Sequence, residues 1–503
     1  DHIVPIPSAC GKFTLSTFAV SGGFTMNDHK QLNQDLDAER LLERQRDAFI
    51  RDEIPDLHER REKLDRLRWV VTAHREEIEE AINADFGNRS RHETDLMELA
   101  GVVQAIDYLK KNLRKFMRAE HRHVGALFQA GRALVEQQPK GVVGIMAPWN
   151  YPFSLTLIPL ATALAAGNRA MLKPSELTPR TSELIKRILA QVFSEEEVAV
   201  VLGGVEVGAA FSRLAFDHLL FTGSTQVGRQ VMRAASENLV PVTLELGGKS
   251  PAVLARGHID SRTMGSIVFG KLSNAGQTCV APDYVLVHEE DLDGFIAQFH
   301  SAVSRTYPEG PCSRDYTSIA SQRHHERLLG LIKDASSKGA RVIEVGVNPK
   351  SASKRPCTLA PTLIIGAGND THVMQQEIFG PILPIVPYRS IGEVISYINE
   401  RPRPLALYYF GNQDADCKAL LARTTSGNVG INNTIMHVAM DDLPFGGIGA
   451  SGMGAYHGIE GFRSMSHAKG IFIQGRWSLP SLLRAPFGRL ADTAIKALLR
   501  PTR

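Results

Sequence analysis

The chain has 503 residues, which is too many for one hydrophobic core and predicts two or three domains. Its hydrophobic fraction of 43% and charged fraction of 22% are typical of a folded globular protein, and a formal net charge of +3 gives no reason to expect a nucleic-acid partner. Five scattered cysteines exclude a disulfide framework and fit a reducing compartment, and no apolar run reaches the roughly 18 to 20 residues that span a bilayer. We therefore predict a cytoplasmic protein without membrane association.

The first segment, residues 1–25, is rich in Ser, Gly and Pro and shows no sustained period. It lacks a basic stretch followed by an apolar core, so we do not interpret it as a signal peptide. We predict a disordered extension over residues 1–27. Over residues 28–85, and again from His92 to Met117, apolar residues recur at three- and four-residue steps between charged ones, which predicts amphipathic helices.

Beyond residue 139 the chain alternates short apolar strands with helices. Strands are predicted over 140–148, 170–173, 217–222, 252–254, 284–287 and 382–386, and helices over 153–167, from Pro179, from the 223–228 loop to about 238, and over 263–273 and 291–305. Loops are predicted over 308–325 and 345–360. This alternation predicts an α/β protein with a parallel, doubly wound sheet, whose ligand lies beyond the carboxyl ends of the strands.

Two side chains stand out chemically. Cys279 follows a polar, Gly-containing stretch that leads into a strand, which is where a rigid scaffold presents a nucleophile, although only the thiolate attacks. Glu245 lies between two leucines directly before a Gly-Gly turn, and apolar surroundings let a carboxylate act as a base near neutral pH. Taken singly, a cysteine is most often a small buried apolar residue and a glutamate a surface residue.

The loop Gly223-Ser224-Thr225-Gln226-Val227-Gly228 joins a predicted strand to a predicted helix. Backbone N–H groups and the helix dipole favour a phosphate at such a junction. The glycine spacing is not G-x-G-x-x-G, so the loop alone is weak evidence for a dinucleotide, and a plain turn is the alternative.

Seven motifs follow one another in the order typical of a single family. They are Pro148-Trp-Asn150, Lys173-Pro-Ser-Glu176, Phe221-Thr-Gly-Ser-Thr225, Glu245-Leu-Gly-Gly-Lys249, Gly276-Gln-Thr-Cys279, Glu377-Ile-Phe-Gly-Pro381 and Pro444-Phe-Gly-Gly447. On these motifs the chain resembles the NAD(P)-dependent aldehyde dehydrogenase superfamily over roughly residues 40–475. The ending Gly452–Gly458 resembles the class 3 branch, and residues 85–94 and 436–443 are most similar to the coniferyl aldehyde dehydrogenases.

The resemblance implies roles for three catalytic residues. Cys279 is expected to attack the aldehyde, and the side-chain amide of Asn150 with the backbone N–H of Cys279 to hold the resulting oxyanion. After hydride transfer to the nicotinamide leaves a thioester, Glu245 is expected to draw a proton from the water that releases the carboxylic acid. No metal is expected.

The resemblance also implies a cofactor site for NAD, with NADP accepted as well. Lys173 and Glu176 are expected to hold the adenosine ribose, and Glu377 and Phe379 to position the nicotinamide ribose and ring. The other expected cofactor-binding residues are Trp149, Gly223, Ser224, Thr225 and Gly228. The last four belong to the 223–228 loop, which is expected near the pyrophosphate. A carboxylate at Glu176 should repel a 2′-phosphate, but class 3 relatives carry it and still tolerate NADP.

The fold implied by the resemblance has a Rossmann-like cofactor domain, an α/β catalytic domain and a bridging arm that pairs two subunits into a homodimer. We assign residues 28–245 to the cofactor domain, with 118–139 in the arm, and 246–430 to the catalytic domain. Residues 431–475 are expected to return to the cofactor domain and arm. Ala133–Gln138 and roughly 460–473 are the candidate arm strands, because their edges would otherwise be exposed.

Two other functions compete with aldehyde oxidation to the acid. An acylating dehydrogenase that passes its thioester to coenzyme A does not need a base such as Glu245. A catalytically silent relative has no reason to retain Asn150, Glu245 and Cys279 together. The substrate choice rests on resemblance, and a medium to large apolar or aromatic aldehyde such as coniferaldehyde is expected.

The tail, residues 476–503, extends past the last motif and carries six basic residues against one acid. From Arg489 to Arg500 its pattern predicts an amphipathic helix. One interpretation is peripheral attachment to an anionic membrane. The other, which we favour, is a terminal helix docked on its own subunit or on its dimer partner.

Overall fold

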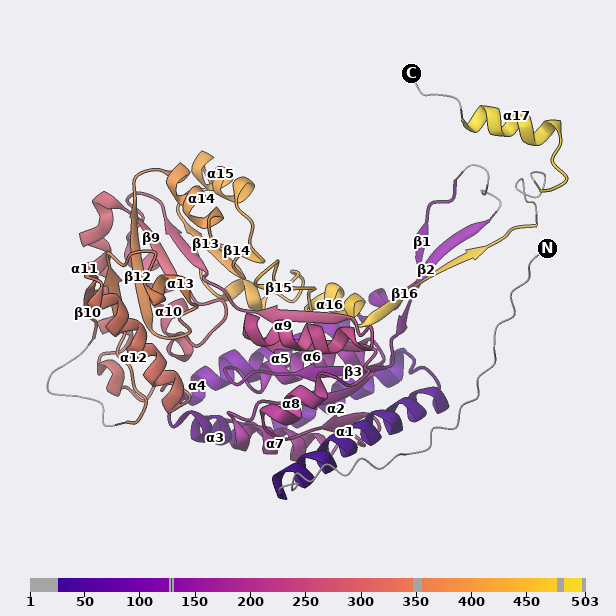
Figure 1. Cartoon of the computed structure of the whole chain (residues 1–503), viewed down its shortest axis with the longest axis horizontal. Helices are drawn as coiled ribbons and strands as arrows, with labels where there is room; N and C mark the ends of the chain where they lie inside the picture. Colours follow the sequence, from indigo (N-terminus) through magenta and orange to yellow (C-terminus); the bar gives the residue numbers. More distant parts are fainter. Residues whose placement is uncertain (1–25, 126–127, 129–130, 347–354, 477–483, 500–503) are drawn as a thin grey trace, which may run out of the picture.

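The computed structural model describes residues 26–125, 128, 131–346, 355–476 and 484–499, and the described strands form three sheets (Figure 1). Residues 1–25 of the predicted extension lie outside this part of the chain. Met26 and Asn27 already belong to the first helix, α1 (Met26–Arg51).

The first sheet has the strand order β15-β7-β6-β3-β4-β5. All neighbours are parallel except the edge pair β15·β7. From β3 the chain builds outward through β4 and β5, then returns to the other side of β3 with β6 and β7, so the predicted doubly wound sheet is confirmed. The strands are β3 (Val142–Met146), β4 (Arg169–Lys173), β5 (Val198–Val200), β6 (His218–Gly223), β7 (Val242–Leu246) and β15 (Gly452–Met453).

The helices around this sheet begin with the predicted helical stretch 28–85, which is divided into α1, α2 and α3. Pro55, which cannot continue a helix, lies in the break between α1 and α2. Asp56 then caps α2 in a reciprocal capping box with Glu59. The predicted helical stretch 92–117 is helical as far as Phe116 but contains a π-helical turn, η1 (Asp95–Leu99). The remaining bounds are α2 (Leu57–Ala73), α3 (Arg75–Phe86), α4 (Arg91–Thr94), α5 (Ala100–Phe116), α6 (Ser154–Ala165), α7 (Pro179–Leu189), α8 (Val205–Phe211), α9 (Thr225–Ser236) and α16 (Gly458–Ser464).

The second sheet has the order β10-β11-β12-β9-β8-β13-β14, parallel except at the edge pair β10·β11. Its strands are β8 (Pro251–Leu254), β9 (Tyr284–His288), β10 (Arg341–Glu344), β11 (Thr362–Ile365), β12 (Ile382–Tyr388), β13 (Ala406–Phe410) and β14 (Asn428–Ile431). Its helices are α10 (Ser261–Leu272), α11 (Leu292–Thr306), α12 (Gln322–Ser337), α13 (His372–Gln375), α14 (Ile391–Asn399) and α15 (Ala415–Arg423), and short 3-10 turns are η3 (Ser273–Gly276), η4 (Glu289–Asp291), η5 (Gly310–Cys312) and η6 (Met436–Ala439). The predicted loop 308–325 therefore ends four residues early, where Ser321 caps α12. Residues 347–354 of the second predicted loop lie outside the described residues.

The third sheet stands away from the body of the molecule (Figure 1). It is antiparallel, in the order β1 (Glu120–Arg122), β2 (Arg132–Pro139) and β16 (Ser466–Ile473). The two segments expected to be arm strands thus pair with each other. Residues 460–464 are helical instead, because Phe462 of α16 is buried against Phe116 of α5, with ring centroids 5.5 Å apart.

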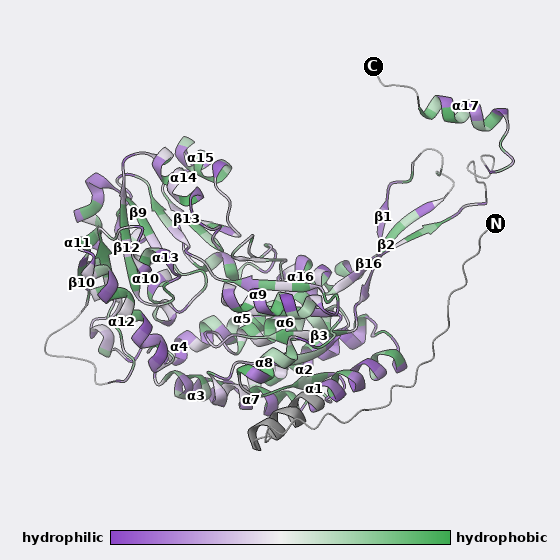
Figure 2. Ribbon diagram, in the orientation of Figure 1, coloured by the Kyte–Doolittle hydropathy of each residue, from purple (hydrophilic) through white to green (hydrophobic). Residues whose placement is uncertain are grey.

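Hydrophobic residues follow the central strands of the two large sheets, and the outer helices present hydrophilic faces (Figure 2). The strands β3, β4, β8 and β13 are buried at every position. This is the pattern of parallel strands covered on both faces.

The helix α17 (Arg489–Leu498) lies beyond the third sheet (Figure 1). Within it only Ala491 is buried, while Leu490 is 73% and Leu498 59% exposed. Within the described part of the chain, the apolar face of this helix is therefore left largely exposed. None of the described helices combines the length and apolar character needed to span a membrane.

Candidate active site

Glu245 lies at the carboxyl-terminal end of β7, between Thr222 of β6 and Gly452 of β15. The residue is only 3% exposed, and among the described residues neither carboxylate oxygen has a hydrogen-bond partner. Burial raises the pKa of this carboxyl well above its ordinary value. Glu245 is therefore suited to hold and release a proton near neutral pH.

Cys279 is half-buried and follows a turn that leaves α10. Burial, and secondarily the charges of Glu377 and Glu245, raise the pKa of its thiol to about 12. The backbone N–H groups of Cys279 and Val280 oppose this shift. The fold thus brings Cys279 into the electrostatic reach of both Glu245 and Glu377.

Asn150 follows β3 and is buried. Its side-chain Nδ2 donates to the carbonyl of Gln277, at 3.0 Å, two residues before Cys279. Its own carbonyl accepts hydrogen bonds from Arg89 Nη1, at 3.1 Å, and from Asn274 Nδ2, at 2.9 Å. Asn150 is therefore tied on both sides to the turn that presents the thiol.

Trp149 and Phe379 form an edge-to-face pair, with ring centroids 5.4 Å apart. Trp149 also contacts His324 of α12, with ring centroids 4.7 Å apart, and Phe86 of α3, at 6.4 Å, two contacts that the sequence did not indicate. Phe379 has a φ of 52°, which is a strained conformation for an aromatic residue. These rings connect the loop after β3 with the segment before β12.

Glu377 folds its carboxylate over the Gly-Gly turn that follows Glu245. A Cβ on Gly247 would overlap both carboxylate oxygens of Glu377, so glycine lets that carboxylate lie against the turn. Burial, and then the charge of Asp283, raise the pKa of Glu377 to about 7, while the Gly248 N–H, Lys249 and Arg327 oppose the rise.

Lys173 ends β4 and is buried, and its Nζ donates to the carbonyl of Pro174 at 2.9 Å. Its Nζ also lies 3.5 Å from the exposed carboxylate of Glu176. Burial lowers the pKa of Lys173, and the charge of Glu176 opposes this effect. The two side chains predicted to act together are thus in contact.

The predicted phosphate loop lies at the start of α9. Ser224 caps the helix, accepting from Val227 N at 3.3 Å, and Thr225 Oγ1 donates to Ala450 O at 3.0 Å. A Cβ on Gly228 would fall 2.7 Å from Leu246 Cδ2, so glycine lets α9 pack closely on β7. Gly223 is the last residue of β6 and precedes the cap.

Comparison with known proteins decides the family. The family model described as "Aldehyde dehydrogenase family" matches residues 26–471. The chain belongs to the aldehyde dehydrogenase family. It is an oxidoreductase that oxidises an aldehyde to the carboxylic acid.

Individual relatives agree with this family assignment. A probable coniferyl aldehyde dehydrogenase of Caulobacter vibrioides is 48% identical, over 92% of this chain and 95% of its own. Aldehyde dehydrogenase family 3 member A2 of Rattus norvegicus is 39% identical, over 87% of this chain and 88% of its own. The predicted resemblance to the class 3 branch and to coniferyl aldehyde dehydrogenases is therefore confirmed.

Solved structures share the fold of this aldehyde dehydrogenase. The substrate-bound state of Staphylococcus aureus AldH has a TM-score of 0.86 and 36% identity, covering 92% of this chain and 99% of the other. A Mycobacterium tuberculosis aldehyde dehydrogenase complexed with NAD+ has a TM-score of 0.79 and 28% identity, covering 88% and 91%. The predicted α/β aldehyde dehydrogenase fold is confirmed.

Sequence reasoning missed the buried ion pair that supports Asn150 in this aldehyde dehydrogenase. Arg89 Nη1 lies 3.0 Å from Glu98 Oε1, and both side chains are fully buried. The other oxygen of Glu98 accepts from the backbone N–H groups of Phe153 and Ser154, at 2.9 and 2.8 Å, and so caps α6. An acid inside an otherwise amphipathic helical pattern was the available signal.

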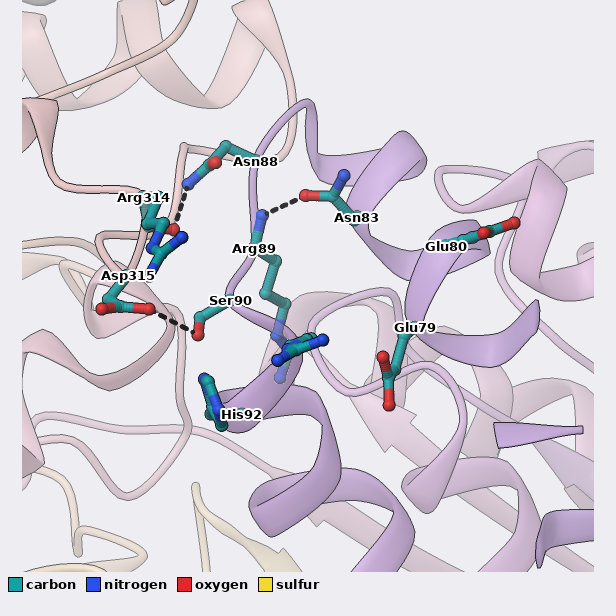
Figure 3. Close-up of a pocket in the computed structure, with 10 residues that line it drawn as sticks. Glu79, Glu80, Asn83, Asn88, Arg89, Ser90, His92, Arg314 and Asp315 are labelled. Atoms are coloured by element: carbon teal, nitrogen blue, oxygen red, sulfur yellow. Dashed lines mark hydrogen bonds between the residues drawn. The ribbon is translucent and has the colours of Figure 1, made fainter. Parts of the chain in front are cut away.

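Arg89 of this ion pair also lines a cavity of about 490 Å³ (Figure 3). Within it, Ser90 Oγ donates to Asp315 at 2.9 Å and Asn88 Nδ2 donates to the Arg314 carbonyl at 3.2 Å. These bonds join the loop after α3 to the segment before α12. The cavity does not include Cys279 or Glu245. Its lining residues are all polar or charged, namely Glu79, Glu80, Asn83, Asn88, Arg89, Ser90, Arg91, His92, Arg314 and Asp315.

Proposed function

We propose that this aldehyde dehydrogenase oxidises an aromatic or medium-chain apolar aldehyde, with coniferaldehyde as the named candidate, and uses NAD in preference to NADP. The observation that carries the mechanism is that the half-buried Cys279 thiol lies close enough to the buried Glu245, 34 residues away in the sequence, for the charge of Glu245 to raise the pKa of the thiol. The coniferyl aldehyde dehydrogenases among the relatives support the substrate.

The residues around the first sheet fit a nicotinamide dinucleotide. The sheet reverses its strand order between β3 and β6, and dinucleotides bind at such a switch point. The loop from Gly223 to Gly228 presents the start of α9 at the end of β6, where backbone N–H groups favour a pyrophosphate. When bound, the cofactor accepts the hydride from the aldehyde carbon.

The other side chains of the proposed cofactor site surround the same end of the sheet. Lys173 and Glu176 would hold the adenosine ribose through their amine and carboxylate. Glu377 would accept hydrogen bonds from the nicotinamide ribose, and Phe379 with Trp149 would form an apolar wall beside the ring. The NAD+ complex of the Mycobacterium tuberculosis relative supports a dinucleotide at this site.

In the proposed acylation step, the Cys279 thiol gives its proton to solvent, and the resulting thiolate attacks the aldehyde carbon and forms a carbon–sulfur bond. The carbonyl electron pair moves to oxygen, where the Asn150 amide and the Cys279 backbone N–H would stabilise it. Asn150 Nδ2 donates to the Gln277 carbonyl in this structure, so it would exchange that bond for one to the oxyanion. Loss of hydride from the former aldehyde carbon leaves a thioester on Cys279.

In the proposed deacylation step, Glu245 takes a proton from a water molecule as that water attacks the thioester carbon. The carbon–sulfur bond then breaks, and the carboxylic acid leaves while sulfur regains its electron pair. The high pKa of Glu245 suits this role, because its carboxylate is basic enough to accept the proton.

A substrate and cofactor panel tests this proposal. Rates of cofactor reduction are compared for acetaldehyde, octanal, coniferaldehyde and a charged semialdehyde, each with and without coenzyme A. We expect the highest kcat/KM with coniferaldehyde or octanal, no dependence on coenzyme A, and a higher value with NAD than with NADP. The highest kcat/KM with acetaldehyde or the semialdehyde would refute the proposed substrate class. A strong preference for NADP would refute the proposed cofactor choice.

We further propose a cytoplasmic homodimer joined through β2 and β16, with α17 covered by the partner subunit. Support comes from the exposed Phe472 and Ile473 on β16 and from the uncovered apolar face of α17. Sedimentation equilibrium should give twice the chain mass. Co-sedimentation with anionic liposomes that is lost on deleting residues 476–503 would instead assign the tail to a membrane surface.

A further inference from the structure

The turn before Cys279 has an unusual backbone. Asn274, Ala275 and Gly276 all have positive φ, at 51°, 51° and 76°. Only Gly276 adopts this conformation without strain, and it also must be glycine, because a Cβ there would overlap the Gly380 carbonyl. Ala275, fully buried, has no side-chain hydrogen bond of its own that favours the left-handed region. The surroundings must therefore hold this turn in place.

Glu93 supplies a side-chain acceptor to the backbone of this turn. Its Oε1 accepts a hydrogen bond from the backbone N–H of Asn274, 181 residues away in the sequence. Its Oε2 accepts from Thr317 Oγ1 at 2.8 Å, which fixes the orientation of the carboxylate. Thr317 is itself buried. One carboxylate thus connects α4, the turn and the segment before α12.

The turn is also the link between the nucleophile and the proposed oxyanion donor. Asn274 Nδ2 donates to the carbonyls of Asn150 and Gln277, at 2.9 and 3.1 Å. Asn150 Nδ2 donates to the same Gln277 carbonyl. A shift of Asn274 therefore moves Asn150 and the backbone that leads to Cys279 together.

We propose that Glu93 is a positioning residue, which holds the left-handed turn Asn274–Gly276 so that Cys279 and Asn150 are aligned for attack on the aldehyde. The hydrogen bonds described for Glu93 go to Asn274 and Thr317, and Glu93 acts on Cys279 through the Asn274 N–H. The proposal rests on the proposed role of Cys279 as nucleophile.

The test compares Glu93→Ala with Glu93→Gln, whose amide oxygen can still accept from Asn274 N. Two readouts are used: kcat and KM for the aldehyde, and the rate at which iodoacetamide alkylates Cys279 in the free enzyme, followed by mass spectrometry. For Glu93→Ala we expect kcat and the alkylation rate to fall on the order of tenfold or more with KM for NAD unchanged, because small misplacements of reacting groups are costly. Glu93→Gln should recover most of both, and Thr317→Val should lie between.

A second variant separates positioning from general loss of structure. Ala275→Gly relieves the left-handed strain, since glycine adopts positive φ freely, so it should restore much of the activity when combined with Glu93→Ala. If Glu93→Ala does not fold, the double variant and Glu93→Gln still decide the question. Wild-type alkylation and kcat in Glu93→Ala, no recovery in the double variant, or equal losses in Glu93→Gln and Glu93→Ala would each overturn the proposal.

The two readouts also distinguish this proposal from the proposed function. Alkylation reports the reactivity of Cys279 without any aldehyde turnover. Full turnover in Cys279→Ser would refute the nucleophile and leave the alkylation result valid as a measure of how Glu93 holds the turn.

Discussion

The carboxylate of Glu377 lies directly over the backbone of Gly247, although 130 positions separate them in the sequence. No side chain fits at position 247 without displacing that carboxylate. The turn is flanked by Glu245 on one side, and Gly248 donates a backbone hydrogen bond to Glu377 on the other. The base and the proposed nicotinamide-ribose ligand are therefore held against the same short turn.

Gly247→Ala should displace Glu377 and weaken cofactor binding. We expect KM for NAD to rise by roughly tenfold, the loss typical of a single hydrogen bond to a charged group, with a small change in thermal midpoint because the Glu377 side chain can rotate away. Gly265→Ala is the matched control, since a Cβ there meets nothing within 4 Å. A large loss of stability with unchanged KM would show that Glu377 serves packing instead.

Glu245→Gln should separate hydride transfer from deacylation. The amide keeps the size of the side chain but cannot take a proton from water, so the thioester should accumulate. Stopped-flow absorbance is expected to show a burst of reduced cofactor, close to one per active site, followed by a slow phase. Loss of the burst itself would mean that Glu245 acts before hydride transfer.

The reactivity of Cys279 should depend steeply on pH in the free enzyme. Because burial and two nearby carboxylates raise the pKa of the thiol to about 12, the thiol is protonated at neutral pH. The thiolate fraction then grows about tenfold per pH unit, so iodoacetamide alkylation should rise with a slope near one between pH 6 and 9. Cys279→Ser provides the background, and it should also abolish aldehyde oxidation. A rate that is already level at pH 6 would show a preformed thiolate.

Glu98→Gln should destabilise the protein strongly. It leaves the Arg89 guanidinium buried without its counter-charge, a change that typically costs about 3–5 kcal/mol. The matched control is Asp107→Asn, which removes the partner of Arg68 in a half-exposed ion pair and should cost about 1 kcal/mol or less. Heat inactivation of the two variants, followed side by side, checks the difference. Equal midpoints would mean that solvent reaches the Arg89 site.

Several features of this protein could be predicted from the sequence alone. The motifs around Asn150, Glu245 and Cys279 are short and local, and their residue types carry their chemistry wherever the chain places them. The buried strands can also be recognised locally, since β3 is a continuous apolar run and β4 has an apolar centre, Ala170–Leu172, between helical patterns. These local signals were sufficient to predict the doubly wound sheet and the family, while the roles of the site residues stay predictions.

Only the tertiary structure decided how these residues influence one another. Glu93 meets Asn274, and Gly247 meets Glu377, across more than a hundred residues, and no local pattern encodes such contacts. The same holds for α16, where the burial of Phe462 against Phe116 outweighs the strand-like pattern. The pKa directions of Glu245 and Cys279 depend on desolvation by groups brought together from distant segments, so they arise only when the chain is folded.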